Sequence, residues 1–293
     1  MKQNLILLVA ALFLPVFAST LFAQADRKLN VIIIGAHPDD ADGVGGTAYK
    51  WKLAGFDVLM VSFTNGDAGH QTRPAEELAK MRRQEARRAG EVIGVKYITL
   101  DNHDGQLMPT YENRLQMIRI IREHRADLVI FPRPYDYHPD HRYTGTLVLD
   151  AAYMVTVPTI LPEVPHLERN PMFLYVSDGF SIPVAFAADV AIDIDDVYEK
   201  KLDMYHEHKS QMYEWMPFNG GYLESVPESD ADRRVWLGER RRGSNATPHR
   251  DKLIELYGAE RGASIRYCET FQDSGYGRRL TKDNMKTYFP FLP

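Results

Sequence analysis

Two short polar stretches carry residue types that bind metal ions and move protons. HPDD (37–40) follows the aliphatic run 31–34, and HPDH (138–141) follows another apolar run at residues 126–132. Imidazole and carboxylate groups together suit a divalent ion such as Zn²⁺. Two histidines with one carboxylate also leave a coordination position for water, which is the arrangement of catalytic rather than structural zinc sites. The residue types therefore indicate a catalytic metal centre.

The spacing within each stretch supports this interpretation. His37 and Asp40 are three residues apart, as are His138 and His141, so a tight loop or a first helical turn can direct both members of a pair to one point. Either motif alone is a weak indication, because an aspartate after a strand also caps helices and H-x-x-H pairs arise by chance. Two such motifs after two strands of one sheet form a much more specific pattern.

Alternating strands and helices are expected to position both motifs. The pattern predicts strands and helices in the order strand 29–37, helix 41–55, strand 57–63, helix 74–90, strand 96–100, helix 111–125 and strand 126–132. This alternation predicts an α/β fold, a Rossmann-like and mostly parallel sheet with helices on both faces. Ligands bind such sheets at the carboxyl ends of the strands, near a switch in strand order, so we expect the metal site at the carboxyl rim.

The C-terminal third is less regular. It predicts strands at FLYVSDGF (173–180) and VAIDI (190–194), helices at 196–215 and 228–242, and a mixed tail from Gly243. No linker separates this part from the rest. We therefore expect a single domain over residues 26–293, with its motifs between about residues 30 and 211 and a C-terminal part, 212–293, that the motifs do not cover.

Composition and charge exclude several classes of protein. The chain has 293 residues, is 44% hydrophobic and 26% charged, and carries a formal charge of -5, so no basic surface for nucleic acid is indicated. Cys268 is the single cysteine, which excludes an intrachain disulfide. A dinucleotide site requires G-x-G-x-x-G after the first strand, whereas GAHP (35–38) stands there.

The first 25 residues have the layout of a secretory signal peptide. Lys2 precedes an apolar run, and AQA (23–25) provides an A-x-A cleavage site before Asp26. Pro15 and the polar pair 19–20 shorten the apolar run below the length of a comfortable membrane span. We expect a secreted or periplasmic protein without a stable membrane anchor after cleavage. The sequence does not decide the oligomeric state, and a homo-oligomer is possible.

Several longer stretches occur in a characteristic order. These are GAHPDDADGVGG, TNGDAG, MRRQEARRAGEVIGV, LDNHDGQL, FPRPYDYHPDHR and HKSQ, with a looser match at YCETF (267–271). In this order they resemble the PIG-L/LmbE-like family of zinc-dependent N-acetylglucosaminyl deacetylases. The resemblance implies a Rossmann-like fold, one Zn²⁺ per chain and hydrolysis of an acetamide on an amino sugar, although the ligand types also permit other divalent ions.

The resemblance also implies roles for individual residues. Carried over by position, His37, Asp40 and His141 would be the metal ligands. Asp39 would be the general base, and His138 would stabilise the oxyanion or protonate the leaving amine. Asp136 and Asp140, near these histidines, are interpreted as partners that orient the rings.

Substrate contacts are implied at two further positions. Arg82 would bind substrate, and Asp104 would contact sugar hydroxyls. From spacing alone, Arg82 resembles a surface residue, because it belongs to a run of arginines at residues 82–88. His208 occupies the family's histidine position in HKSQ without an assigned role. Tyr213 and Trp215, just after it, are interpreted as core residues or as the floor of a sugar subsite.

One departure from the family pattern keeps a second function open. The family reads AHPDDE, whereas residue 41 is alanine, and Asp42 follows it. The missing glutamate is not a metal ligand in the family, so the metal set is intact, but support of the site and activity are in question. A metal-containing glycan-binding protein without turnover is one alternative, and an amidase acting on a non-sugar amide is another. Retention of Asp39 and His138 favours an enzyme, since binding alone needs neither.

Overall fold

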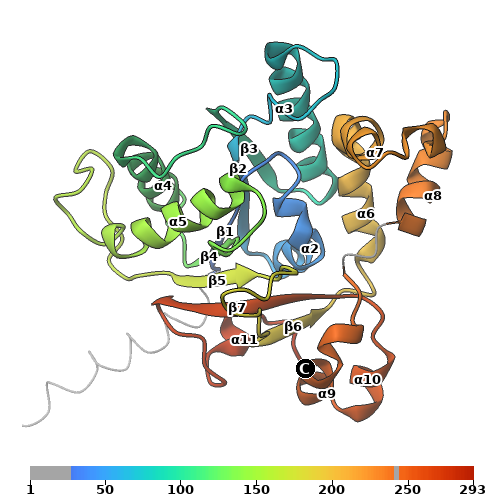
Figure 1. Ribbon diagram of the computed structural model, residues 1–293. Coiled ribbons are helices and arrows are strands. Elements are labelled where there is room, and N and C mark those ends of the chain that lie inside the picture. Colours follow the sequence, from blue (N-terminus) through green and yellow to red (C-terminus); the bar gives the residue numbers. More distant parts are fainter. Residues whose placement is uncertain (1–27, 241–243) are drawn as a thin grey trace, which may run out of the picture.

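The computed structural model describes residues 28–240 and 244–293 of the chain. Its strands are β1 (Asn30–Gly35), β2 (Asp57–Thr64), β3 (Lys96–Asn102), β4 (Leu128–Phe131), β5 (Met172–Val176), β6 (Val190–Asp193) and β7 (Cys268–Gly277). They form one seven-stranded sheet in the order β3-β2-β1-β4-β5-β7-β6 (Figure 1). The pairs among β1 to β5 are parallel, and β7 is antiparallel to both of its neighbours. The predicted signal peptide lies outside the described residues.

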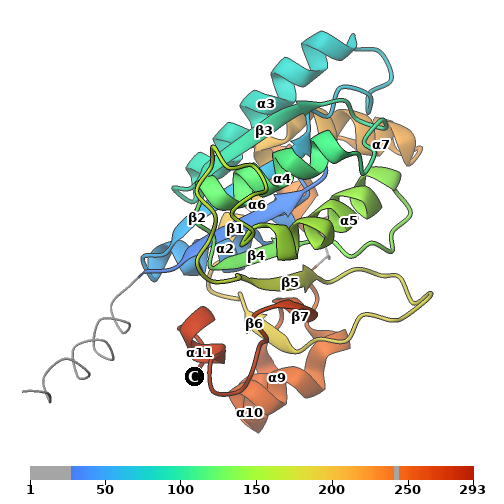
Figure 2. The ribbon, with the colours of Figure 1, turned by 90° about the vertical axis from the view of Figure 1, so that its left-hand side faces the viewer.

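Helices cover both faces of the sheet. The main ones are α2 (Gly45–Leu53), α3 (Ala75–Val92), α4 (Tyr111–Glu123), α5 (Pro139–Met154), α6 (Tyr198–Glu207), α7 (Met216–Asn219), α8 (Asp230–Arg240), α9 (Arg250–Tyr257), α10 (Ala259–Ser264) and α11 (Met285–Tyr288). Figure 2 looks onto the face covered by α4 and α5, and α2, α3 and α6 lie behind the sheet. The expected α/β architecture is therefore confirmed.

The aliphatic run of β1 is explained by this double cover. Val31 and Ile33 pack into the core shared with α2, α3 and α6, whereas Ile32 and Ile34 pack into the core shared with α4 and α5. A strand that is buried on both faces has no polar alternation, which is why the sequence shows a continuous apolar run.

The order of the strands places both motif loops together. The chain leaves β1 for β2 and β3 on one side and then returns to β4 on the other side of β1. The loops after β1 and β4 therefore border the crevice where the strand order switches, as the sequence predicted. In the part of the chain that the structure describes, no helix is long and apolar enough to cross a bilayer.

One expectation for the C-terminal third is wrong, and one strand there was not predicted. The single helix expected at 196–215 is two elements, because α6 ends at Glu207 and a π-helical segment follows at Ser210–Trp215. His208 between them has φ -82° and ψ 60°, and its side chain turns into the protein interior. The tail from Gly243 contains a ten-residue strand, β7, that the sequence pattern did not predict. Its outer half is exposed and contains two glycines, so an apolar alternation is missing there.

Candidate metal centre

A tight loop after β1 fixes the first pair of candidate ligands. The backbone N–H groups of Ala36 and His37 both donate to Asp40 Oδ2, at 2.9 and 2.7 Å. The N–H of Asp39 donates to the carbonyl of His37 at 2.8 Å. Gly35 is required for this turn, since a Cβ there would lie 2.5 Å from the Asp40 Cβ. The loop therefore directs the side chains of His37 and Asp40 to the same place.

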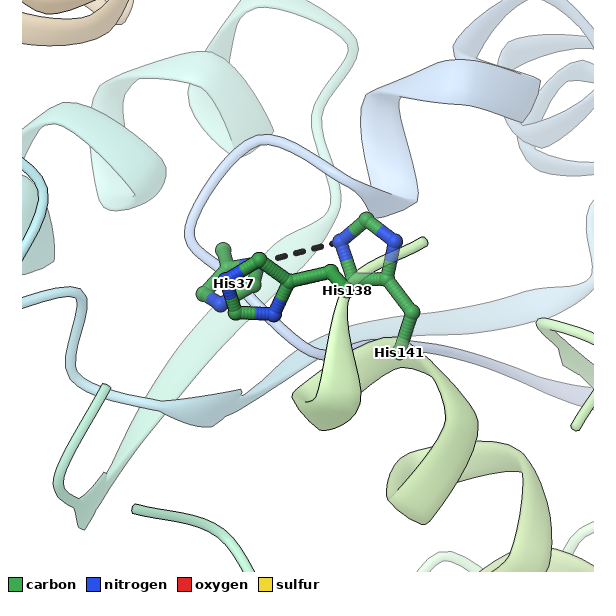
Figure 3. Close-up of side chains that lie close together, drawn as sticks. All are labelled: His37, His138 and His141. Carbon is green, nitrogen blue, oxygen red and sulfur yellow. Dashed lines mark hydrogen bonds between the residues drawn. The ribbon is translucent and has the colours of Figure 1, made fainter. Parts of the chain in front are cut away.

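The start of α5 fixes the second pair. Asp136 Oδ1 accepts a hydrogen bond from the His138 N–H at 2.9 Å. His138 is the N-cap of α5, and its Nδ1 accepts from the Asp140 N–H at 3.2 Å. Pro139 stands in the first helical turn, where its missing N–H is not needed. His141 follows one turn into the helix and faces the loop after β1 (Figure 3).

Three ligand atoms converge between the two loops. His37 Nδ1 lies 3.1 Å from His141 Nε2 and 3.5 Å from Asp40 Oδ2, and His141 Nε2 lies 3.4 Å from the same Asp40 oxygen. Ligands bound to zinc at about 2.0–2.1 Å in a tetrahedron are about 3.3 Å apart. The three predicted ligands thus match the spacing that a tetrahedral ion requires.

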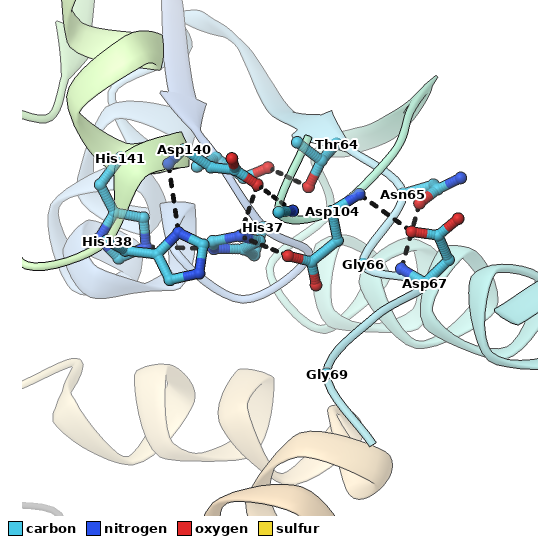
Figure 4. Close-up of polar contacts among 12 residues, drawn as sticks. His37, Thr64, Asn65, Gly66, Asp67, Gly69, Asp104, His138, Asp140 and His141 are labelled. Carbon is cyan, nitrogen blue, oxygen red and sulfur yellow. Dashed lines mark hydrogen bonds and ion pairs between the residues drawn. The ribbon is translucent and has the colours of Figure 1, made fainter. Parts of the chain in front are cut away.

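The outer nitrogens of the two rings face carboxylates. His141 Nδ1 lies 3.0 Å from Asp136 Oδ1, and His37 Nε2 lies 3.2 Å from Asp104 Oδ1 and 3.4 Å from Asp140 Oδ2 (Figure 4). These partners favour tautomers with the protons on the outer nitrogens. The inner nitrogens then present lone pairs to each other and to Asp40, an arrangement that either a proton or a bound metal ion relieves.

The electrostatics of the site follow from this convergence. Burial alone would lower the pKa of His141, but the charge of Asp40 and the hydrogen bond to Asp136 raise the pKa to about 10. Burial and the positive charges of His37 and His141 lower the pKa of His138. Two other groups of possible ligand atoms lie within 4.8 Å of one another, and both include His37. The first adds His138 and His141, and the second adds Asp104 and Asp140.

The two predicted catalytic residues flank these ligands. Asp39 is 5% exposed, and its Oδ1 accepts a hydrogen bond from Gln211 Nε2 at 3.2 Å. The half-buried ring of His138 lies 4.6 Å from the ring of His37 and 5.2 Å from that of His141, measured between centroids. The structure therefore places the ring of His138 beside the rings of His37 and His141, and Asp39 in the same loop as His37 and Asp40.

The predicted substrate-binding residues are buried. Arg82 is 1% exposed, so its interpretation as a surface residue is wrong. Its guanidinium donates to the carbonyl of Gly66 at 2.6 Å, to the carbonyl of Gly69 and to the side chain of Gln211. Asp104 lies between this guanidinium, at 3.6 Å, and His37 (Figure 4). Substrate binding by either side chain stays a prediction.

The HKSQ stretch (208–211) contacts both the loop after β1 and helix α3. His208 Nε2 lies 3.2 Å from Asp42 Oδ2, and both residues are fully buried. Ser210 donates through its N–H and its hydroxyl to Glu85, at 2.9 and 2.7 Å. Gln211, which contacts both Asp39 and Arg82, was not singled out from the sequence. Its only signal was its place in a stretch that resembles a family motif.

A cavity borders the alanine that stands at position 41. The buried Ala41 lines a cavity of about 170 Å³ that also borders Glu269. Glu269 accepts from the N–H groups of Gly46 and Thr47 at 3.0 and 2.7 Å and pairs with Lys201 at 2.7 Å. A carboxylate from β7 thus stabilises the N-terminus of α2.

Of the aromatic residues after HKSQ, one is excluded from a sugar subsite. Tyr213 is 2% exposed and its hydroxyl hydrogen-bonds His206, so it belongs to the core. Trp215 is half-buried and stacks on Phe218 at 6.1 Å between ring centroids. Only Trp215 of this pair has exposed surface to offer a ligand.

Several known proteins are similar to this chain in sequence or in fold. Residues 32–152 match the family model described as GlcNAc-PI de-N-acetylase. The chain is 34% identical over 224 residues to diacetylchitobiose deacetylase of Thermococcus kodakarensis, covering 68% of this chain and 81% of that relative. It is 26% identical over 197 residues to a probable N-acetyl-alpha-D-glucosaminyl L-malate deacetylase 2 of Bacillus anthracis, covering 63% and 82%. The inhibitor complex of N,N'-diacetylchitobiose deacetylase from Pyrococcus horikoshii is similar in structure, with a TM-score of 0.59, 25% identity and coverage of 83% and 82%.

Proposed function

Because the chain belongs to the PIG-L family of deacetylases, we propose that it is an exported, zinc-dependent hydrolase that removes the N-acetyl group from an N-acetylated amino sugar or glycoconjugate. The products are acetate and a free amine. One observation carries the proposal: the ligand atoms of His37, Asp40 and His141 converge to 3.1–3.5 Å between the loops that also hold Asp39 and His138. The names of the relatives support an N-acetylated sugar derivative as the substrate class.

The three converging residues would hold one Zn²⁺ per chain. The bound ion would polarise the acetamide carbonyl and lower the pKa of a water molecule to about 7. Asp136 and Asp140 support this set from outside, because their carboxylates face the outer nitrogens of His141 and His37. Such partners fix the orientation of a histidine ring and raise its basicity as a ligand.

Asp39 is the proposed general base. Asp39 precedes Asp40 in the loop after β1, and at 5% exposure its side chain is away from bulk water. It takes a proton from the attacking water, a contribution that is typically about 10²–10⁴-fold in rate. The rigid turn after β1 keeps the base and the ligands in one fixed relation.

His138 is the proposed oxyanion donor. Its Nδ1 accepts from the Asp140 N–H, so the neutral ring carries its proton on Nε2. The lowered pKa keeps this ring neutral near pH 7. An Nε2–H group can donate to the negative charge that develops on the acetamide oxygen. Of the two roles implied by the family, this geometry favours stabilising the oxyanion over protonating the amine.

The test is acetate release from a panel of N-acetylated saccharides, with zinc content measured on the same sample. We expect about one zinc per chain and turnover of at least one saccharide. Asp39→Asn preserves size and removes the base, so it should keep zinc and lose at least about 10²-fold in kcat. Asp101→Asn is the matched control, because Asp101 is exposed and pairs only across the surface with Arg83.

Other outcomes would reassign the protein. Zinc binding with cleavage of a non-sugar N-acetyl amide alone would indicate an amidase. Glycan binding without acetate release would indicate a binding protein. Normal turnover by Asp39→Asn would leave Asp39 with a structural role in the loop.

Export is proposed from the N-terminal 25 residues, which lie outside the described residues. Expression of the full chain in a Gram-negative host should give a periplasmic protein whose measured intact mass is that of a chain starting at Asp26. A cytoplasmic protein with an uncleaved N-terminus would contradict export without affecting the proposed chemistry.

A further inference from the structure

We propose that Gln211 is a positioning residue that orients the carboxylate of Asp39 and is itself fixed by Arg82. The proposal rests on the function proposed above, in which Asp39 is the base. Gln211 lies in the π-helical segment and is nearly buried. Its side chain bridges the two residues, since Nε2 donates to Asp39 Oδ1 at 3.2 Å and Oε1 accepts from Arg82 Nη2.

The direction of this bridge is set by chemistry. A guanidinium has only donors, so the amide oxygen of Gln211 must face Arg82. The amide NH₂ group must then face Asp39, whose ionised carboxylate has only acceptors. A reversed amide would place two acceptors together at Asp39 and two donors together at Arg82. Arg82 therefore fixes which end of Gln211 the base receives.

The residues just before Gln211 are bonded to two different parts of the protein. His208 contacts Asp42 in the loop after β1, and Ser210 donates twice to Glu85 of α3. These contacts explain why α6 ends at Glu207 and the chain continues as a π-helical segment, a rare conformation that is frequent at functional sites. The segment thus has little freedom to move Gln211 away from Asp39.

The bond from Gln211 to Asp39 comes from a neutral amide, which stabilises an ionised carboxylate less than a charged donor in the same place would. The amide of Gln211 fixes the rotation of the carboxylate through a weaker bond. The fixed rotation matters because a misplacement of about 1 Å in an active site can cost about 10²-fold in rate.

The experiment compares three variants in the zinc-loaded protein. Gln211→Met keeps the length and removes both contacts, and Gln211→Glu keeps an acceptor for Arg82 while turning a second carboxylate toward Asp39. We expect both to lower kcat by about 10–100-fold with unchanged KM and zinc content, because only the alignment of the base is lost. Trp51→Phe is the control. It removes a buried hydrogen bond to the carbonyl of Tyr288, which holds neither Gln211 nor Asp39, so it should lower Tm without changing kcat.

Two results would overturn the proposal. The first is a parental kcat in both Gln211 variants. The second is a fall in kcat that Trp51→Phe reproduces at an equal loss of Tm, since that would show a purely structural effect.

A structural measurement separates this proposal from the proposed function. Crystal structures of the zinc-loaded parent and Gln211→Met should show the Asp39 carboxylate rotated or shifted in the variant. An unchanged carboxylate overturns the positioning role. If the parent releases acetate from no saccharide, the proposed function fails, and this comparison still decides whether Gln211 positions Asp39.

Discussion

Two buried polar clusters meet below the carboxyl rim of the sheet, and their atoms pair in opposite ways. In the metal cluster, His37, Asp40 and His141 turn three atoms that can bind a metal toward one another. The second cluster, which we call the anchoring cluster, consists of Asp42, Arg82, Glu85, His208, Ser210 and Gln211. Its contacts join a donor to an acceptor, as from Arg82 to Gln211 and from Ser210 to Glu85. Converging ligand atoms mark a place for a metal ion, or for a proton in its absence, whereas donor–acceptor pairs mark contacts that hold the fold together.

The comparison predicts that zinc affinity depends on one cluster and stability on the other. A buried pair that loses one partner leaves a desolvated polar group, which costs about 1–3 kcal/mol of folding free energy. A metal ligand that is lost removes part of a much larger binding free energy. Variants in the two clusters should therefore separate in a plot of zinc affinity against Tm.

The largest effect on zinc is expected for His141→Ala. The variant removes one of the three converging atoms, so zinc affinity should fall by more than about 100-fold, beyond the effect of losing an outer partner. Isothermal titration against a chelator competitor measures this. The exposed His103→Ala is the control, since His103 contacts Asp67 at the surface. Full zinc occupancy in His141→Ala would remove this residue from the ligand set.

A smaller effect is expected for Asp136→Ala. Asp136 lies 3.0 Å from the outer nitrogen of His141 and touches the metal cluster only through that ring. Loss of such a partner typically costs about 10–100-fold in metal affinity. The same titration measures it, and a value equal to that of His141→Ala would indicate that Asp136 is itself a ligand.

Raising the pH by one unit should strengthen zinc binding by about tenfold, at the lower end of the effect expected for Asp136→Ala. In the metal-free protein Asp40 and Asp136 outweigh burial and raise the pKa of His141 to about 10, so the ring is protonated at neutral pH. Zinc must displace this proton, and the apparent Kd falls about tenfold per pH unit for each proton released. A Kd that is flat with pH would mean that the ring is already neutral.

The same proton also stabilises the metal-free fold. Because the pKa of His141 is higher in the folded than in the unfolded chain, its contribution is complete below about pH 6.5 and is lost as the pH rises toward 10. The rise in Tm on adding zinc should therefore be larger at about pH 8.5 than at about pH 6.5. His141→Ala should show no such trend.

The two clusters also differ in how far the sequence could predict them. The metal cluster comes from two short motifs in the segments that follow β1 and β4, and the rule that ligands bind at the carboxyl ends of parallel strands brings them together. The parallel part of the sheet around the site followed from the apolar runs of β1 to β4. Local patterns were sufficient for this part of the sheet and for the metal cluster, but not for β7.

The anchoring cluster required information that local patterns lack. It joins residue 42, α3 and residues 208–211, which are far apart in the chain. The periodicity of 196–215 favoured a single helix, whereas the inward turn of His208 ends α6 at Glu207. Arg82 resembled a solvated arginine because its partners, the carbonyls of Gly66 and Gly69, are backbone atoms that leave no trace in the sequence.

Arg82→Lys should have the smallest effect on zinc while still damaging the anchoring cluster. Lysine keeps the charge but cannot reach Gly66, Gly69 and Gln211 at once with a single nitrogen. We expect a loss of about 1–3 kcal/mol in unfolding free energy, or about 2–4 °C in Tm for each kcal/mol, with unchanged zinc affinity.

The neighbouring Arg83→Lys is the internal control for that variant. Arg83 points about 100° away around α3 and pairs with Asp101 at the surface, so its Tm, KM and kcat should match the parent. If Arg82 also binds substrate directly, Arg82→Lys raises KM even at temperatures well below its Tm, where the variant is fully folded. A parental Tm with a raised KM would assign Arg82 to the substrate rather than to the anchoring cluster. A parental Tm, KM and kcat in both variants would remove Arg82 from either role, and the contrast between the two clusters would then rest on Gln211, Ser210 and His208.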